Sequence, residues 1–183
     1  MQESALFVEV EAAERLVGHW RRRYDPVAGR GVPAHITALF PFREPSTLGP
    51  LQLNALARLA AGIECHSYTL AAINEFPGVL YLQPSPDEWF RLLTRQLYAA
   101  FPDCPPYAGR IDDPQPHLTV GQFADESDQQ RVRQAFAAEV GNSLPMQCTA
   151  TALSLFVSDN MGNWSVAARF PFGVRGKNKK VLG

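Results

Sequence analysis

The spacing of hydrophobic residues along the chain changes repeatedly between a strand pattern and a helix pattern. Ala5–Val10 is almost entirely apolar and predicts a strand. In Glu11–Tyr24 the apolar positions fall at i, i+3, i+4, i+7 and i+11, which predicts an amphipathic helix with one apolar face. A glycine-containing loop, Val27–Val32, then leads into a second strand near His35.

The same order of elements continues downstream and then restarts. A turn-rich segment at residues 45–50 opens a helix that ends near Ala61. Ser85–Glu88 matches a capping box with proline at the first helical position. Ser127 and Gln130 predict the start of the last long helix. The remaining strands are predicted at His66–Phe76, Val79–Gln83, Met146–Val157 and Trp164–Phe172, and a proline-rich loop at Asp103–Pro116.

Two of the predicted strands carry the same short motif, His35-Ile36-Thr37 and His117-Leu118-Thr119. Residues i and i+2 of a strand point to the same face, so each motif places an imidazole beside a hydroxyl. Ile36 and Leu118 point the opposite way, into apolar packing. The chain has four histidines. The probability that two of them have a threonine two positions later by chance is roughly 1%. Ordinary packing of two strand histidines is the alternative interpretation.

The order strand, helix, His-x-Thr strand, helix, strand occurs twice, with the two histidines 82 positions apart. This repeat predicts an α+β fold of two duplicated βαβαβ units, over about residues 5–76 and 79–172, related by a pseudo-twofold axis. With 183 residues, of which 46% are hydrophobic, the chain can form one bilobal domain, assigned to residues 1–174. The basic residues 175–183 predict a solvated, flexible tail.

Charge and cysteine content exclude some classes of protein. A net charge of −1 excludes a protein that coats nucleic acid through a broadly basic surface, but not an enzyme that holds one phosphate or one RNA end. Three widely spaced cysteines without a CxxC pair predict reduced thiols. The sequence has neither a membrane-spanning run nor a basic signal-peptide start, so we expect a cytoplasmic protein without a membrane partner. We also expect the protein to be a monomer.

The paired motifs fit the chemistry of a phosphodiester. Displacement at phosphorus proceeds in line, so a base and an acid are needed on opposite sides of one phosphate. Histidine suits both roles because its pKa lies near neutrality. A pseudo-twofold axis would place His35 and His117 on the two sides, with reactive nitrogens roughly 6–9 Å apart. Thr37 and Thr119 would donate to non-bridging oxygens. This mechanism requires no metal or other cofactor, and carboxylates are not clustered near either motif as a two-metal site would need.

The two His-x-Thr motifs, one in each half, resemble those of the 2H phosphoesterase superfamily, which includes RNA 2′,3′-cyclic phosphodiesterases and proteins named 2′-5′ RNA ligases. The resemblance extends from about Leu6 to Phe172. It implies a bilobal α+β fold with antiparallel sheets around a central cleft. It also implies that His35 and His117 are the catalytic pair and that Thr37 and Thr119 are the phosphate donors.

The activity implied by the resemblance is metal-independent action on 2′,3′-cyclic phosphate ends of RNA, on cyclic nucleotides or on 2′-5′ linkages. The partner would be an RNA end or a small cyclic nucleotide. Two alternatives stay open. One is a nucleotide- or RNA-end-binding protein of the same fold with little turnover, and the other is a 2′-5′ RNA ligase that uses the same residues in reverse.

Six further residues are candidates for substrate binding. Arg43 and Arg110 lie near the motif segments and would hold a distal phosphate, although such arginines more often form ion pairs at the rim of a site. Four aromatic residues would stack on a base, although aromatic residues in strands more often belong to the core; these are Phe40, Tyr81, Phe123 and Trp164. His19 and His66 lack a threonine two places on and are predicted to be structural or surface residues.

Overall fold

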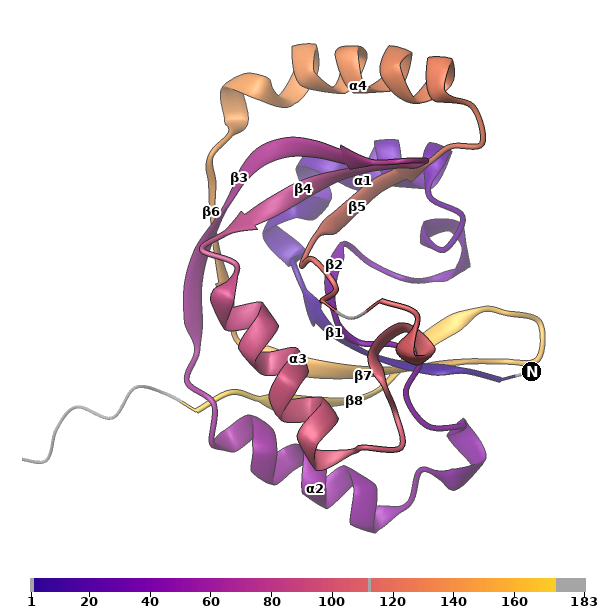
Figure 1. Cartoon of the computed structure of the whole chain (residues 1–183), viewed down its shortest axis with the longest axis vertical. Helices are drawn as coiled ribbons and strands as arrows, with labels where there is room; N and C mark the ends of the chain where they lie inside the picture. The colour runs from indigo at the N-terminus through magenta and orange to yellow at the C-terminus, as the bar shows by residue number, and fades with distance from the viewer. Residues whose placement is uncertain (1, 112, 174–183) are drawn as a thin grey trace, which may run out of the picture.

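Two four-stranded antiparallel sheets form the framework of the protein, described by a computed structural model over residues 2–111 and 113–173 (Figure 1). The first sheet has the order β2-β1-β7-β8 and the second β5-β4-β3-β6. Strands of the first sheet are β1 (Ser4–Glu9), β2 (His35–Leu39), β7 (Ala152–Ser158) and β8 (Trp164–Pro171). Strands of the second are β3 (His66–Phe76), β4 (Val79–Ser85), β5 (Leu118–Gln122) and β6 (Met146–Ala150). The α+β class with antiparallel sheets is therefore confirmed.

Helices cover one face of each sheet. The four α-helices are α1 (Glu14–Tyr24), α2 (Pro50–Ala61), α3 (Glu88–Ala100) and α4 (Glu126–Val140). Contacts join α1 and α4 to the second sheet, and α2 and α3 to the first, so that α4 and α2 lie at opposite ends of the molecule (Figure 1). Within the described residues, no helix has the length and apolarity needed to cross a membrane.

The helix-covered faces carry the apolar residues of the strands. Val8 and Ile36 from the first sheet, and Leu80 and Leu118 from the second, are at most 1% exposed and belong to one core cluster that runs through both lobes. Burying each such side chain stabilises the fold by about 1.5–3 kcal/mol. Because side chains alternate along a strand, the remaining positions of β2 and β5 are left for polar residues on the uncovered faces.

The two sheets do not divide along the two halves of the sequence. β3, from the first half, pairs with β4 and β6 in the second sheet, whereas β7 and β8, from the second half, complete the first. The turn between β3 and β4 explains the crossing of β3. Phe76 pairs directly with Val79, and Gly78 takes a positive φ of 79°, so the two-residue turn forces the strands to be neighbours.

The segment predicted as one strand over Met146–Val157 is interrupted at Thr151. Its first part, β6, pairs with β3 in the second sheet, and its second part, β7, pairs with β1 in the first. Periodicity could not locate the break because apolar residues continue on both sides of Thr151. One continuous stretch of backbone therefore connects the two lobes.

Both predicted helix caps are wrong in position. β4 extends to Ser85, which pairs with Thr69, so Ser85 cannot cap α3, which begins at Glu88. Asp125, rather than Ser127, caps α4, and its carboxylate accepts hydrogen bonds from the amides of Ser127 and Asp128. Aspartate satisfies free amides of the first turn as well as serine does.

The basic last turn of α1, Arg21–Arg23, contains one buried charge. Arg21 is only 2% exposed and its guanidinium contacts Asp25 at 2.8 Å. Arg21 also donates to the carbonyl oxygen of Val32 at 3.2 Å, which ties α1 to the loop before β2. A buried charge held by an acidic partner and a carbonyl anchors this loop, because either group alone would be costly to bury.

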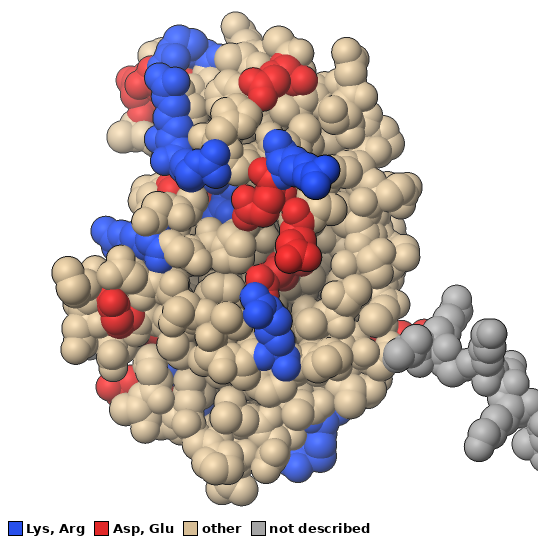
Figure 2. Space-filling model, turned by 180° about the vertical axis from the view of Figure 1, so that it is seen from behind, with Lys and Arg blue, Asp and Glu red and all other residues tan. Residues whose placement is uncertain are grey.

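Surface charge is mixed in sign. Seen from behind, acidic and basic side chains are interspersed, with acidic groups near the middle and basic groups on several sides (Figure 2). No broad basic area appears among the described residues on this face, in keeping with the net charge of −1. The predicted basic tail, residues 175–183, lies outside the described residues. The three cysteines form no disulfide with one another.

Candidate active site

The two His-x-Thr motifs lie at the starts of β2 and β5 and alternate as predicted. In each, the histidine and threonine are partly exposed, whereas Ile36 and Leu118 between them are 0% exposed. The imidazole and hydroxyl of each motif therefore share the uncovered face of their sheet, and the aliphatic residue joins the core.

Corresponding positions of the two sheets surround the motifs in the same way. Phe7 pairs with Thr37 across β1 and β2, and Tyr81 pairs with Thr119 across β4 and β5. Each pair follows an irregularity in register, between Leu6 and Phe7 in one sheet and between Leu80 and Tyr81 in the other. The repeat predicted from the sequence thus extends to the local geometry around each motif.

An aromatic ring supports each histidine. The Phe7 ring lies 4.0 Å from the imidazole of His35, centroid to centroid. The Tyr81 ring lies 5.4 Å from His117, and Phe76 packs on both Tyr81 and His117. Phe7 and Tyr81 are 6% and 3% exposed, so these rings restrict the orientation of the imidazoles and leave little free surface for stacking.

The backbone fixes the tautomer of both histidines. Nδ1 of His35 donates to the carbonyl oxygen of Pro33, and Nδ1 of His117 to that of Gln115, each at 2.8 Å. A carbonyl oxygen can only accept, so Nδ1 carries the hydrogen in both rings. Each neutral imidazole therefore keeps the lone pair on Nε2, the atom available for proton transfer.

Residues of the two motifs meet although they belong to different sheets. Thr37 and His117 line the same small pocket, and β2 and β5 contact one another. The charge of His117 also acts on His35 and lowers its pKa. His35 and Thr119 do not line this small pocket themselves, but each lies two residues along its strand from the motif residue that does.

The surroundings favour neutral imidazoles in the free protein. Burial lowers the pKa of His35 to about 3, and the nearby positive charge of Arg21 acts in the same direction. Burial also lowers the pKa of His117, while the carbonyl of Gln115 acts in the opposite direction. An anionic phosphate between the rings would favour their charged forms, because opposite charges stabilise each other.

One difference in charge distinguishes the two motifs. Glu9 pairs with His35 in the register of β1 and β2, and Ser154 donates to its carboxylate at 2.5 Å. In the second sheet, Tyr81 pairs with Thr119 and Leu82 pairs with Leu118. The next residue of β4, Gln83, therefore lies beside His117. The side-chain amide of Asn74 donates to Gln83. A carboxylate thus accompanies one histidine and an amide the other.

Tyr107 is a residue of this site that the sequence did not indicate. It lines the pocket with Thr37 and His117, and its hydroxyl forms a hydrogen bond with Thr37. Its backbone is left-handed, with φ 50°, as is that of Ala108, with φ 55°. The amide of Tyr107 donates to the carbonyl oxygen of Phe40 at 2.6 Å, which holds this conformation. Left-handed non-glycine residues cost about 1–3 kcal/mol each and concentrate at functional sites.

Three of the six candidates for substrate binding lie near the motifs. Phe40 and Trp164 pack edge to face near Phe7, at the far end of β2 from His35. Phe40 also lines the pocket that contains Thr37 and His117. Tyr81 supports His117, as described above.

The structure does not bring the remaining three candidates to the motifs. Arg43 pairs with Asp103 at 2.8 Å, and Arg110 is exposed at the end of a short turn. Phe123 packs on Tyr24 in the core. The more common roles of such residues, in rim ion pairs and in the core, therefore apply to Arg43 and Phe123.

Comparisons with known proteins agree with this architecture. A family model described as the 2′-5′ RNA ligase superfamily matches residues 8–162. No curated protein matches the sequence. The crystal structure of E. coli LigT complexed with 3′-AMP is 18% identical, covers 93% of this chain and 98% of its own, and has a TM-score of 0.59. TT0787 of Thermus thermophilus is also 18% identical, with 95% and 100% covered and a TM-score of 0.63. At these identities the two structures share the fold.

Proposed function

The chain belongs to the 2′-5′ RNA ligase superfamily of 2H phosphoesterases, and from this premise we propose that it is a metal-independent phosphodiesterase that opens 2′,3′-cyclic phosphates of RNA ends or nucleotides. The observation that carries the proposal is the matched pair of histidines. In both rings Nδ1 donates a hydrogen bond to a backbone carbonyl oxygen, so Nε2 is the nitrogen available to the substrate.

In the proposed reaction, one Nε2 takes a proton from water as its oxygen attacks phosphorus. The other imidazole, protonated at Nε2, gives a proton to the ribose oxygen that leaves on the opposite side. After one turnover the two rings have exchanged roles, and solvent restores them. Acid–base catalysis of this kind contributes about 10²- to 10⁴-fold to the rate. The negative charge of the phosphate stabilises the imidazolium that the free protein disfavours.

Hydroxyl groups would stabilise the charge that develops on the non-bridging oxygens. Thr37 and Thr119 share a face with the histidines and would each donate to one oxygen. Tyr107 bonds to Thr37 in the free protein. We assign Tyr107 the role of orienting the Thr37 hydroxyl, or of donating to the phosphate itself once Thr37 has turned toward it.

The ligands found in structures of the same fold support a nucleotide or RNA end as the substrate. Structures of E. coli LigT, which shares the fold, are complexes with 3′-AMP and with NADP⁺. Phe40 and Trp164 form an aromatic pair beyond Thr37, where a base of the substrate would stack.

The test is turnover of a 2′,3′-cyclic nucleotide and of an oligonucleotide ending in a cyclic phosphate, each with EDTA present. We expect hydrolysis of at least one. Nucleotide binding without turnover would instead identify a binding protein. Formation of a 2′-5′ linkage from a cyclic-phosphate end and a 5′-hydroxyl end, without net hydrolysis, would identify a ligase.

A further inference from the structure

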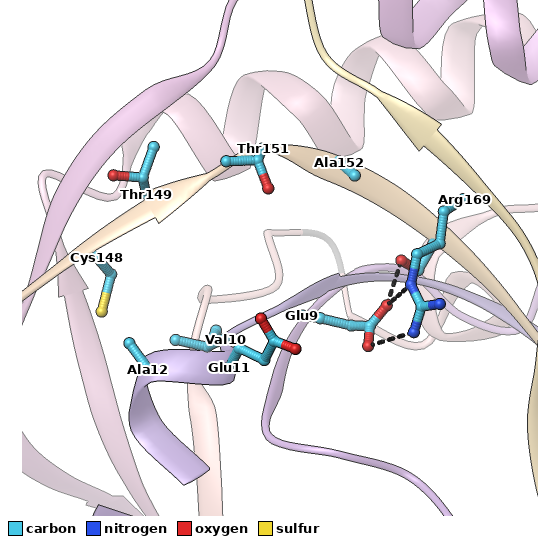
Figure 3. Close-up of a pocket in the computed structure, with 10 residues that line it drawn as sticks. Glu9, Val10, Glu11, Ala12, Cys148, Thr149, Thr151, Ala152 and Arg169 are labelled. Carbon is cyan, nitrogen blue, oxygen red and sulfur yellow. Dashed lines mark hydrogen bonds and ion pairs between the residues drawn. The ribbon is translucent and has the colours of Figure 1, made fainter. Parts of the chain in front are cut away.

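A second cavity, of about 580 Å³, opens at the end of the first sheet (Figure 3). Its walls come from the end of β1 and the turn after it, from the bend between β6 and β7, and from β8. The polar and charged residues that line it are Glu9, Glu11, Thr149, Thr151, Ser154 and Arg169. Cavities of this size accommodate a nucleoside.

The position of this cavity links it to the proposed site. Glu9, on its wall, is the residue opposite His35 in the sheet register. The aromatic pair of Phe40 and Trp164 lies toward the other end of β2. The cavity and the aromatic pair therefore lie on opposite sides of His35 and Thr37. The nucleoside that carries the cyclic phosphate would place its base in the cavity, and the preceding base of an RNA end would stack on the aromatic pair.

A fixed guanidinium forms one wall. Arg169 donates to both carboxylate oxygens of Glu9, at 2.8 and 3.0 Å (Figure 3). Ser154 donates to the same carboxylate. The Arg169 side chain is nevertheless 55% exposed. A guanidinium whose edge is bound by a carboxylate keeps its plane free, and such planes stack on nucleobases.

The charge of the cavity indicates which part of a nucleotide it takes. Glu9 and Glu11 give two negative charges against the one positive charge of Arg169, which disfavours a phosphate group. The Glu11 carboxylate can only accept hydrogen bonds, and an amino group of a nucleobase is a suitable donor. The Thr151 hydroxyl points into the same open space (Figure 3).

We propose that this cavity binds the nucleobase of the substrate and favours bases that carry an exocyclic amino group, with Arg169 stacking on the base and Glu11 accepting from the amino group. The inference rests on the proposed function for its choice of ligand, but its binding test does not require turnover. Uracil has no amino group, so cytosine and uracil, which have the same ring size, make the sharpest comparison.

The experiment measures binding of 3′-CMP and 3′-UMP by calorimetry, together with kcat/KM for the corresponding 2′,3′-cyclic nucleotides. We expect the wild type to prefer the cytosine compound about tenfold or more, as one well-placed hydrogen bond to a charged group provides. Glu11→Gln should reduce this ratio toward one, and Arg169→Lys should weaken binding of both nucleotides. Glu126→Gln, in a separate cavity, is the matched control and should change neither.

The outcomes separate the two proposals. If neither cyclic nucleotide is hydrolysed but the cytosine preference is present and depends on Glu11, the proposed function fails and the base site stands. If hydrolysis occurs but the cytosine-to-uracil ratio is near one, or is the same in Glu11→Gln, the base site is overturned. Thermal melting of each variant checks that these exposed substitutions leave the fold intact.

Discussion

Glu9 lies directly opposite His35 in the antiparallel register of β1 and β2. Its negative charge raises the pKa of His35, against burial and the charge of Arg21, which both lower it. At the corresponding place in the second sheet, Gln83 carries no charge. The two histidines are therefore alike in geometry and unlike in their electrostatic surroundings.

This difference makes the roles of the histidines measurable. We expect a bell-shaped dependence of kcat/KM on pH, since one imidazole must be neutral and the other protonated. Removing the carboxylate in Glu9→Gln should lower the pKa of His35 further and move one limb of the curve to lower pH. A shift of the acidic limb identifies His35 as the base, and a shift of the basic limb identifies it as the acid. Gln83→Glu, the reciprocal variant, should move the other limb to higher pH. The prediction fails if neither variant moves a limb.

His35→Ala and His117→Ala should each reduce kcat by about 10²- to 10⁴-fold, because each removes one partner of the proton transfer. Steady-state hydrolysis of a cyclic nucleotide measures the loss. His19→Ala is the control, since this histidine is half exposed on α1 and pairs with Glu139. Activity near the wild-type level in either motif variant would contradict the mechanism.

Thr37→Val and Thr119→Val keep the side-chain shape and remove the hydroxyl. We expect kcat to fall by about 10²-fold in each case while KM changes little, because a donor to a developing charge acts mainly in the transition state. A rise in KM at constant kcat would show instead that the hydroxyls only bind the ground state.

Tyr107→Phe removes one hydroxyl and keeps the ring. Loss of the hydrogen bond to Thr37 should reduce kcat/KM about tenfold, the value of a neutral hydrogen bond, with the melting temperature nearly unchanged. Tyr98→Phe, on the exposed side of α3, serves as the matched control. Equal activity of the two variants would leave Tyr107 with a role in loop packing only.

The lowered pKa of His35 also predicts how stability depends on pH. The unfolded chain takes up this proton near the ordinary value of 6.5, whereas the folded chain does so only near pH 3. Unfolded molecules therefore bind more protons between these values, and stability falls as the pH falls through this window. Between pH 7 and 5 the wild type should lose about 1–2 kcal/mol more unfolding free energy than His35→Gln. Urea denaturation at the two pH values measures the difference, and equal losses would show that His35 is protonated normally.

Local pattern predicted much of this fold and the centre of its site. The period-two alternation around His35 and His117 correctly placed each imidazole beside a hydroxyl, because a buried aliphatic residue between them fixes the strand's faces. The bounds of β3, His66–Phe76, also agree with the prediction. Local pattern could not predict the order of the strands in the sheets, because the pairing of β1 with β7 joins residues that are far apart in sequence. Tyr107 was missed because its place depends on a left-handed turn at residues that are not glycine.

The exchange of strands between the lobes limits how this protein can be divided. A fragment ending at the turn after Phe76 would contain β1 without its partner β7, and β3 without either of its neighbours. Both would present open sheet edges, which invite pairing with other molecules. Although the order of strands and helices repeats along the sequence, we expect that neither half folds stably when it is produced without the other.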